Sequence, residues 1–253
     1  MRSRKAWKSV SARRLLSMAG DPPKIEDAIE TVAARVLEGI RCPPTDLLTL
    51  ASRLGIAAVY ADDIPGSGLL RREEGQTFVV YSSTLSAVRS RFTIAHEIAH
   101  LIVDRDYRGH FVRKGRELER LCDMLAAELL MPRSVFRQHA GKAPSLQTVF
   151  ELAKVFGTSL AATAIRCCEL GRASVFEVED GMVTWSRGLI RTVDASLVEV
   201  VRDALGGKPV DQVVYVSRRA ARGSWRLEGT PIARRRALFL LSPTKREATG
   251  SAG

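Results

Sequence analysis

The chain has 253 residues, of which 45% are hydrophobic and 26% are charged, a balance typical of a globular protein. No apolar run approaches the roughly 20 residues that span a bilayer, and the four cysteines show no C-x-x-C spacing. We therefore expect a reduced cytoplasmic protein without a disulfide framework. The formal net charge of +11 suits nucleic acid or an acidic partner, and equally a basic surface that binds neither.

Residues 1–20, MRSRKAWKSVSARRLLSMAG, contain six basic residues and no acidic one. A secretory signal needs an apolar core of about 7–15 residues, and the run LLSMAG is too short for one. The charge predicts a disordered basic arm.

The next segments alternate between helical and strand patterns. Apolar residues at helical spacing in IEDAIETVAARVLEGI and LLTLASRLGI predict two helices, the second ending at Gly55. Residues 57–60 are expected to form a short strand, and 68–72 with 77–81 a hairpin. Four further helices are expected at 85–103, 117–130, 145–156 and 159–170.

From Ala173 the pattern changes to short alternating runs with one helix near residues 194–205, which indicates a second α+β unit. The expected fold class is α+β, with a mainly helical first domain that carries a small sheet. The expected divisions are a basic arm (1–20), a first, mainly helical domain (21–132), a helix-turn-helix-like segment (133–171), a C-terminal α+β domain (172–242) and a disordered tail (243–253).

The stretch HEIAH places His96 and His100 four residues apart, so that both project from one face of a helix. Their imidazoles can therefore reach one zinc ion. Glu97 lies about 100° round the helix from His96, where it can act as a general base on a water molecule. Either histidine alone would more often be an ordinary polar residue of a helix.

A metal ion needs further ligands, and RELERLCDMLAAELLMP provides them. Glu119 is the candidate third ligand, and Asp123, four residues on, can accept a hydrogen bond from the far nitrogen of a metal-bound histidine. Glu117 is the nearest competitor for the third ligand. Mixed nitrogen and oxygen donors fit zinc first and also permit manganese.

These two motifs, FTIAHEIAHLIVD and ERLCDMLAAELLMP, closely resemble the ImmA/IrrE family of bacterial zinc metallopeptidases, which are of the gluzincin type. The clear match covers about 91–132, and a looser one covers 22–170. The resemblance implies a zincin-like domain in which His96, His100 and Glu119 bind zinc and Glu97 is the catalytic acid/base. Asp123 stands where many members have Asn.

The expected chemistry is hydrolysis of a peptide bond, with Glu97 taking a proton from water and delivering it to the leaving amine. Tyr107 and His110 are candidate donors to the oxyanion, although each also fits an exposed loop position. Strand 77–81 can pair with an extended peptide if it lies at the edge of its sheet. As an interior strand of a mixed sheet it would be structural.

Two weaker signals concern nucleic acid. The helix pair at 145–170 has the rhythm of a helix-turn-helix but few base-reading side chains, which favours a structural role. An arginine-rich stretch with one tryptophan suits nucleic acid or an acidic partner, or a solvated pair of strands. Its candidate contact residues are Arg218, Arg219, Arg222, Trp225, Arg234, Arg235 and Arg236.

By resemblance, the substrate is a protein, namely a DNA-binding repressor of the helix-turn-helix kind encoded nearby, whose cleavage releases stress-response or mobile-element genes. Two alternatives remain at this point. One is a non-catalytic regulator that keeps zinc structurally and binds DNA. The other is a toxin-like partner in a two-gene module.

Overall fold

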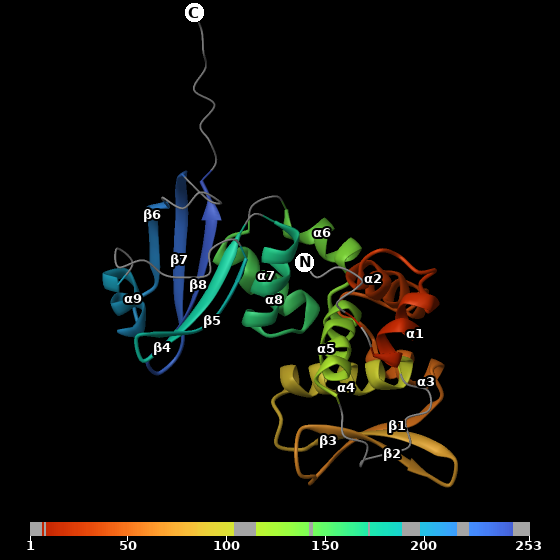
Figure 1. Cartoon of the computed structure of the whole chain (residues 1–253). Coiled ribbons are helices and arrows are strands. Elements are labelled where there is room, and N and C mark those ends of the chain that lie inside the picture. Colours follow the sequence, from red (N-terminus) through yellow and green to blue (C-terminus); the bar gives the residue numbers. More distant parts are fainter. Residues whose placement is uncertain are drawn as a thin grey trace, which may run out of the picture. The chain divides into compact units, whose positions relative to one another are not determined.

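The fold is described from a computed structural model, shown in Figure 1. The chain divides into two compact units, Met1–Phe136 with Lys154–Ser159 and Arg137–Ala153 with Leu160–Gly253, here called unit 1 and unit 2. The expected boundaries at 132 and 171 differ from this division, because the segment 133–171 is itself split between the units. The residues that the structure describes are 7, 9–103, 115–141, 144–171, 173–188, 198–216 and 223–244.

Unit 1 begins with a helix where the sequence predicted a disordered arm. Helix α1 spans Val10–Met18, and Ser9 caps it by accepting a hydrogen bond from the backbone N–H of Ala12. The prediction for residues 1–20 is therefore wrong over 10–18. Ala12, Leu15 and Leu16 recur at helical spacing and are buried, and their burial outweighs the solvation of the basic residues between them.

Two short helices follow α1, and both lie close to the predicted positions. Helix α2 spans Ile25–Val36, with Glu26 and Asp27 in its first turn. Helix α3 spans Leu47–Arg53, and the carboxylate of Asp46 caps it by accepting from Thr49 N.

A small mixed sheet follows α3, with strands β1 (Ile56–Asp62), β2 (Gly68–Glu73) and β3 (Gln76–Ser82). The order is β1-β3-β2, in which β3 pairs with β1 in parallel and with β2 antiparallel. Strand β3 is therefore the interior strand, and β1 and β2 are the edges. Of the two readings of residues 77–81, the structure shows the structural strand inside a mixed sheet.

The helices that carry the two motifs pack on this sheet. Helix α4 (Ala87–Val103) contacts β2 and β3, and helix α5 (Arg116–Leu130) packs against α4 (Figure 1). Pro132 ends α5, and α6 (Arg133–Ala140) follows. The carboxylate of Glu128 accepts a hydrogen bond from the backbone N–H of Arg133, the first residue of α6, at 2.7 Å.

The predicted helix pair is formed by α7 (Leu146–Phe156) and α8 (Leu160–Leu170). Gly157, at φ +62°, lies between them in a conformation that favours glycine. In the described part of the chain no single helix is long and apolar enough to cross a membrane. Among the described helices, α7 and α8 taken together, with a bend of 112° between them, have the necessary length and composition.

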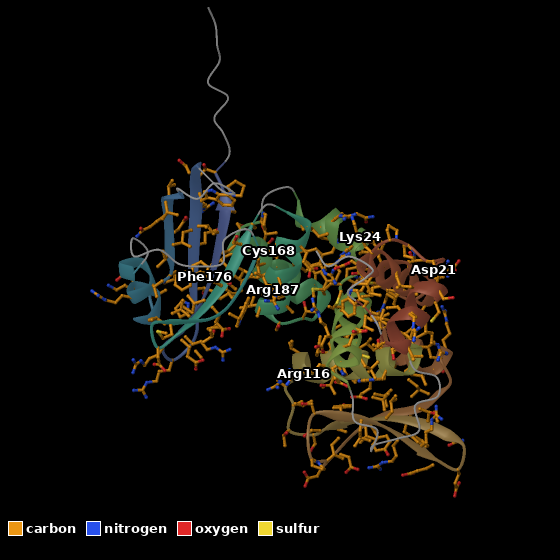
Figure 2. All side chains as sticks on the ribbon, in the orientation of Figure 1. Asp21, Lys24, Arg116, Cys168, Phe176 and Arg187 are labelled. Carbon is orange, nitrogen blue, oxygen red and sulfur yellow. The ribbon has the colours of Figure 1, made fainter. Side chains whose placement is uncertain are left out.

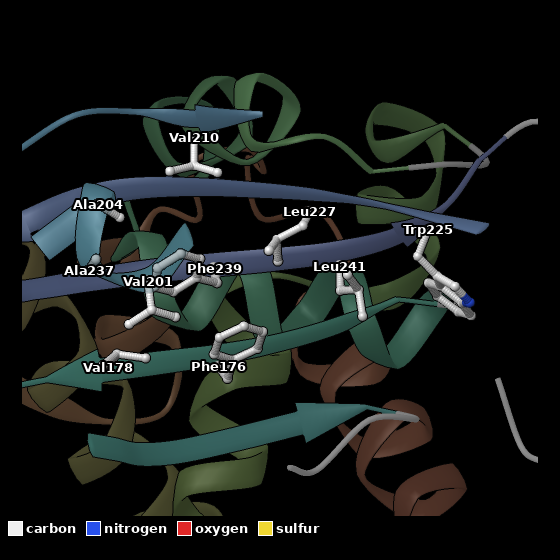
Figure 3. Packing of buried hydrophobic residues seen from close by; sticks show 10 residues of the cluster. All are labelled: Phe176, Val178, Val201, Ala204, Val210, Trp225, Leu227, Ala237, Phe239 and Leu241. Atoms are coloured by element: carbon white, nitrogen blue, oxygen red, sulfur yellow. The ribbon is translucent and has the colours of Figure 1, made fainter. Parts of the chain in front are cut away.

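Unit 2 contains a five-stranded antiparallel sheet of order β5-β4-β8-β7-β6. One face carries an apolar cluster that includes Phe176 and Phe239, whose stacked rings have centroids 5.0 Å apart (Figure 3). This layering agrees with the predicted α+β class. The elements are β4 (Ser174–Glu179), β5 (Met182–Gly188), α9 (Val198–Leu205), β6 (Val210–Val216), β7 (Gly223–Ala233) and β8 (Arg236–Pro243).

Candidate metal centre

Two histidines on one face of α4 form the base of the site. His96 and His100 are one turn apart, and their Nε2 atoms are 3.1 Å from each other. Ile94 and Ile98 lie on the opposite face and are buried. This apolar stripe fixes the rotation of α4, so the two imidazoles face the same space.

Helix α5 adds a carboxylate to this pair. Glu119 Oε2 lies 3.4 Å from His96 Nε2, and Glu119 Oε1 lies 3.4 Å from His100 Nε2. Two elements that are separate in sequence thus place three donor atoms within 4.8 Å of one another. The structure brings together the three residues that the sequence singled out as ligands.

The donors lie close enough together for one metal ion. Ligand atoms about 2.05 Å from a tetrahedral zinc ion lie about 3.3 Å from one another. The two Nε2 atoms are 3.1 Å apart, and each has one of the two Glu119 oxygens at 3.4 Å. Glu119 Oε1 is also buried without a hydrogen-bond partner among the described residues, so a cation would compensate its charge. Two imidazoles and one carboxylate form the donor set of catalytic zinc sites that keep a fourth position open.

Asp123 lies near Nδ1 of His96, whereas His100 and Glu119 lie near Nε2 of the same ring. Its Oδ1 is 3.0 Å from His96 Nδ1. With Nε2 facing a metal, Nδ1 carries the hydrogen, and the Asp123 carboxylate is placed to accept it. Burial lowers the pKa of His96, but the hydrogen bond with Asp123 and the charges of Glu97, Asp123 and Glu119 outweigh burial and raise this pKa above its usual value.

Glu97 lies beside the metal ligands in a nearly enclosed position, with only 3% of the residue exposed. Its neighbour across the helix–sheet interface is Gly68, the first residue of β2. A Cβ atom added to Gly68 would overlap Thr93 Cγ2 and lie 3.5 Å from Glu97 Cγ. The missing side chain therefore lets the edge strand β2 approach the part of α4 that carries Glu97.

An exposed aromatic residue lies next to the site. Phe92 precedes His96 by one turn of α4, and their ring centroids are 6.2 Å apart. Phe92 is 36% exposed, although the neighbouring residues Thr93 and Ile94 are buried. An exposed apolar ring thus lies beside His96. Neither Gly68 nor Phe92 was predicted from the sequence, although a glycine at the start of a strand is a known sign of close backbone approach.

The competing acidic residues have other partners. Glu117 Oε1 accepts a hydrogen bond from Ser9 N at 2.8 Å, and Glu128 caps α6. Glu119 is therefore the acidic residue of α5 that joins both histidines.

Several predicted site residues lie elsewhere. Tyr107 and His110 fall outside the described residues, as do Arg218, Arg219 and Arg222. Trp225 is 6% exposed and belongs to the apolar cluster of unit 2, which is not the exposed position that a contact with nucleic acid requires. The aromatic ring is buried because β7 alternates and directs Trp225 and Leu227 to the same face.

Two of the described arginines of the basic stretch pair with carboxylates. Arg235 Nε is 2.7 Å from Asp180 Oδ1, and Arg236 is 2.9 Å from Glu177 Oε1. These pairs reduce the positive charge that the stretch offers to a nucleic acid. The predicted role of Arg234 stays a prediction.

Comparison with known proteins gives a structural neighbour for the chain and a family match for the segment that carries the metal centre. The chain resembles a solved structure described as a Mycobacterium tuberculosis transcriptional regulator, with a TM-score of 0.60 and 16% sequence identity over 85% of this chain and 75% of that chain. At this identity the likeness concerns the fold alone. No curated protein matches the sequence significantly. Residues 51–167 match the family model of the IrrE N-terminal-like domain, peptidase M78, and this segment contains every residue of the metal centre. Residues 51–167, with the whole metal centre, are therefore similar to the IrrE N-terminal-like domain.

Proposed function

We propose that the protein is a zinc-dependent endopeptidase. The observation that carries this proposal is the convergence of donor atoms of His96, His100 and Glu119 within 4.8 Å of one another, with Glu97 on the adjoining position of α4. A metal site with a purely structural role does not require a nearly enclosed carboxylate beside its ligands. The family match supports the same reaction class.

Each residue around the site would have a distinct task. A zinc ion held by the three ligands would supply Lewis acidity to a substrate carbonyl and to a water molecule. Glu97 would accept a proton from that water and deliver it to the leaving nitrogen. Asp123 would hold the His96 ring in the orientation that keeps Nε2 toward the ion. Phe92 would contact an apolar group of the substrate near the scissile bond.

The edge strand β2 of the small sheet can bind a substrate peptide. Strand β2 has β3 on one side only, so its other side presents backbone groups that can pair with an extended peptide. Gly68 brings the start of this strand to Glu97. A peptide added to β2 would therefore pass the metal centre. The interior strand β3, for which the sequence suggested this role, has both sides occupied.

We further propose that the substrate is a DNA-binding repressor of the helix-turn-helix kind, encoded near the gene of this protein. Support for this substrate comes from the resemblance to the ImmA/IrrE family and the match of residues 51–167. Cleavage of the repressor would release the genes that it controls.

The test is to incubate the zinc-loaded protein with the repressor encoded beside its gene and to follow cleavage by mass spectrometry. We expect the wild type to cut the repressor at a defined bond. The variant Glu97→Gln should bind zinc with an unchanged Kd and lose at least 1,000-fold in kcat/KM, because it cannot accept a proton. Glu97→Asp keeps the carboxylate and should retain partial activity.

The outcome also separates the competing functions. Intact repressor together with DNA binding that weakens at higher salt would contradict the peptidase and favour a non-catalytic regulator. Intact repressor held in a stable complex would favour a toxin-like partner. Cleavage by Glu97→Gln at the rate of the wild type would show that Glu97 is not the proton acceptor.

A further inference from the structure

Residues ahead of α1 contact the first turn of the helix that carries the third metal ligand. Ser9 N donates a hydrogen bond to Glu117 Oε1 at 2.8 Å. The guanidinium carbon of Arg120 lies 5.3 Å from the centroid of the Trp7 ring, over which it stacks. Trp7 is only 7% exposed. These contacts flank Glu119 on both sides in sequence.

Among the described residues, the first turn of α5 has no side-chain cap at its N-cap position. The N-cap position is Gly115, which has no side chain to accept a hydrogen bond from the free N–H groups of the helix. Glu119 N makes the first helical bond, to Gly115 O at 3.2 Å. Glu119 thus lies where a helix frays most easily. A ligand in a fraying turn would spend part of its time away from the two histidines.

The N-terminal segment is itself firmly held. Ser9 caps α1, and Ala12, Leu15 and Leu16 of that helix are at most 2% exposed. Helix α1 packs against α2, α4 and α5. Trp7 and Ser9 are therefore presented to α5 from a fixed part of unit 1.

From these contacts we propose that Trp7 and Ser9 are positioning residues for the metal centre, which they serve by holding the first turn of α5 so that the Glu119 carboxylate stays between the two imidazoles. This inference rests on the proposed metal site, because Glu119 matters only if it binds the ion. It adds residues more than one hundred positions away in sequence to the determinants of metal affinity.

The test measures the Kd of the full chain for Zn²⁺ by competition with a chromophoric chelator, below the melting temperature of each metal-free variant. Trp7→Ala should weaken binding about 10-fold, within the 10–100-fold range of residues that orient metal ligands. Ser9→Pro removes the N–H group that bonds Glu117, and the φ of −66° at Ser9 suits proline. Ser9→Ala removes the same hydroxyl cap of α1 but keeps the N–H group. We expect Ser9→Pro to bind zinc more weakly than Ser9→Ala.

An exposed residue of the same turn serves as the control. Arg116 is the first residue of α5, and its side chain is exposed (Figure 2). Arg116→Ala removes a positive charge near the site without touching the N-terminal segment. It should leave the zinc Kd within about 2-fold of the wild type.

A double-mutant cycle shows whether the effect passes through Glu119. In the Glu119→Ala background the zinc affinity should fall to that of a site with two histidine ligands. In this background Trp7→Ala should cause no further change in the Kd. An equal loss in both backgrounds would overturn the inference, as would a zinc Kd of Trp7→Ala and Ser9→Pro equal to that of the wild type. Failure of the wild type to bind zinc would instead overturn the metal site itself. Zinc binding without peptide cleavage would leave the positioning result intact and contradict only the proposed function.

Discussion

Asp123 is the most exposed of the side chains around the metal centre, at 58%, and yet its carboxylate is 3.0 Å from His96 Nδ1. Removal of this contact by Asp123→Ala should weaken zinc binding by about 10–100-fold, because the imidazole loses both its orientation and part of its basicity. Asp123→Asn keeps an oxygen acceptor and should lose clearly less. Isothermal titration with Zn²⁺ measures both values, and equal losses for the two variants would contradict a role in accepting the hydrogen bond.

Residue-level prediction from the sequence depended on helical periodicity. His96 with His100 and Glu119 with Asp123 are spaced by four residues, so each pair shares a helical face before any tertiary contact is known. What brings the two faces together is the packing of α4 against α5, which no local pattern specifies. The sequence did not predict the roles of Gly68, Phe92 and Trp7 for the same reason. Gly68 and Trp7 contact the site through elements that are distant in sequence, and the exposure of Phe92 depends on tertiary packing.

At the scale of elements, the interface between β2 and α4 depends on the absence of one methyl group. In Gly68→Ala the new Cβ would overlap Thr93 Cγ2 and lie 3.3 Å from Val80 O. Overpacking of this kind costs about 1–3 kcal/mol, and we expect a loss of that size in the free energy of unfolding together with a lower kcat/KM. Urea denaturation measures the first quantity.

A second substitution provides the control for this prediction. Thr93→Ser removes Cγ2 and keeps the hydroxyl group, which makes room for the new methyl group. The double variant Gly68→Ala/Thr93→Ser should recover much of the stability that Gly68→Ala loses. A double variant that is no more stable than Gly68→Ala would show that the overlap with Thr93 is not the cause.

In unit 2 a buried carboxylate accepts a hydrogen bond from the first residue of a helix. Glu228 of β7 is 7% exposed, and its Oε2 accepts a hydrogen bond from Leu146 N, at the first residue of α7. Burial raises the pKa of Glu228 by more than this hydrogen bond and the charge of Arg226 lower it. The folded chain therefore holds this proton more tightly than the unfolded chain does.

The sign of the resulting pH dependence follows from proton linkage. Below the unfolded pKa of about 4.3, Glu228 is neutral in both the folded and the unfolded chain, so burial of its charge does not lower the free energy of unfolding. As the pH rises through the folded pKa, ionisation of the buried group lowers the free energy of unfolding. Glu228→Gln keeps an acceptor for Leu146 N without this ionisation, so its stability relative to the wild type should increase between about pH 4 and pH 7. Urea midpoints at both pH values measure this change, and a pH-independent difference would contradict it.

The same scale shows where the sequence predicted elements well and where it did not. The hairpin of β2 and β3 was predictable because Glu74 and Gly75 form a tight turn between two alternating runs. The parallel pairing of β1 with β3 was not, since it joins strands that are not consecutive. Helix α1 was not predicted, because the basic residues around its buried Leu15 and Leu16 favoured a disordered arm.

For the whole molecule, the division into two units predicts which part of the chain a bound metal ion stabilises against unfolding. All ligands and Glu97 belong to unit 1, and the sheet around Phe176 and Phe239 belongs to unit 2. An ion that binds only the folded site stabilises it by about 2.7 kcal/mol at a free concentration of 100 times the Kd. Unit 1 should therefore unfold at a higher temperature with zinc present than with a chelator.

Hydrogen–deuterium exchange read by mass spectrometry locates this stabilisation. With zinc at 100 times the Kd, amides of α4 and α5 should exchange more slowly, because zinc binding makes the opening of unit 1 about 100 times rarer. Amides of β4 and β8 report on unit 2 and should exchange at the same rate with and without metal. The variant His100→Ala should abolish the zinc effect on α4 and α5. Slower exchange in β4 and β8 would show that the two units unfold together, and unchanged exchange in α4 and α5 would contradict metal binding at the site built by His96, His100 and Glu119.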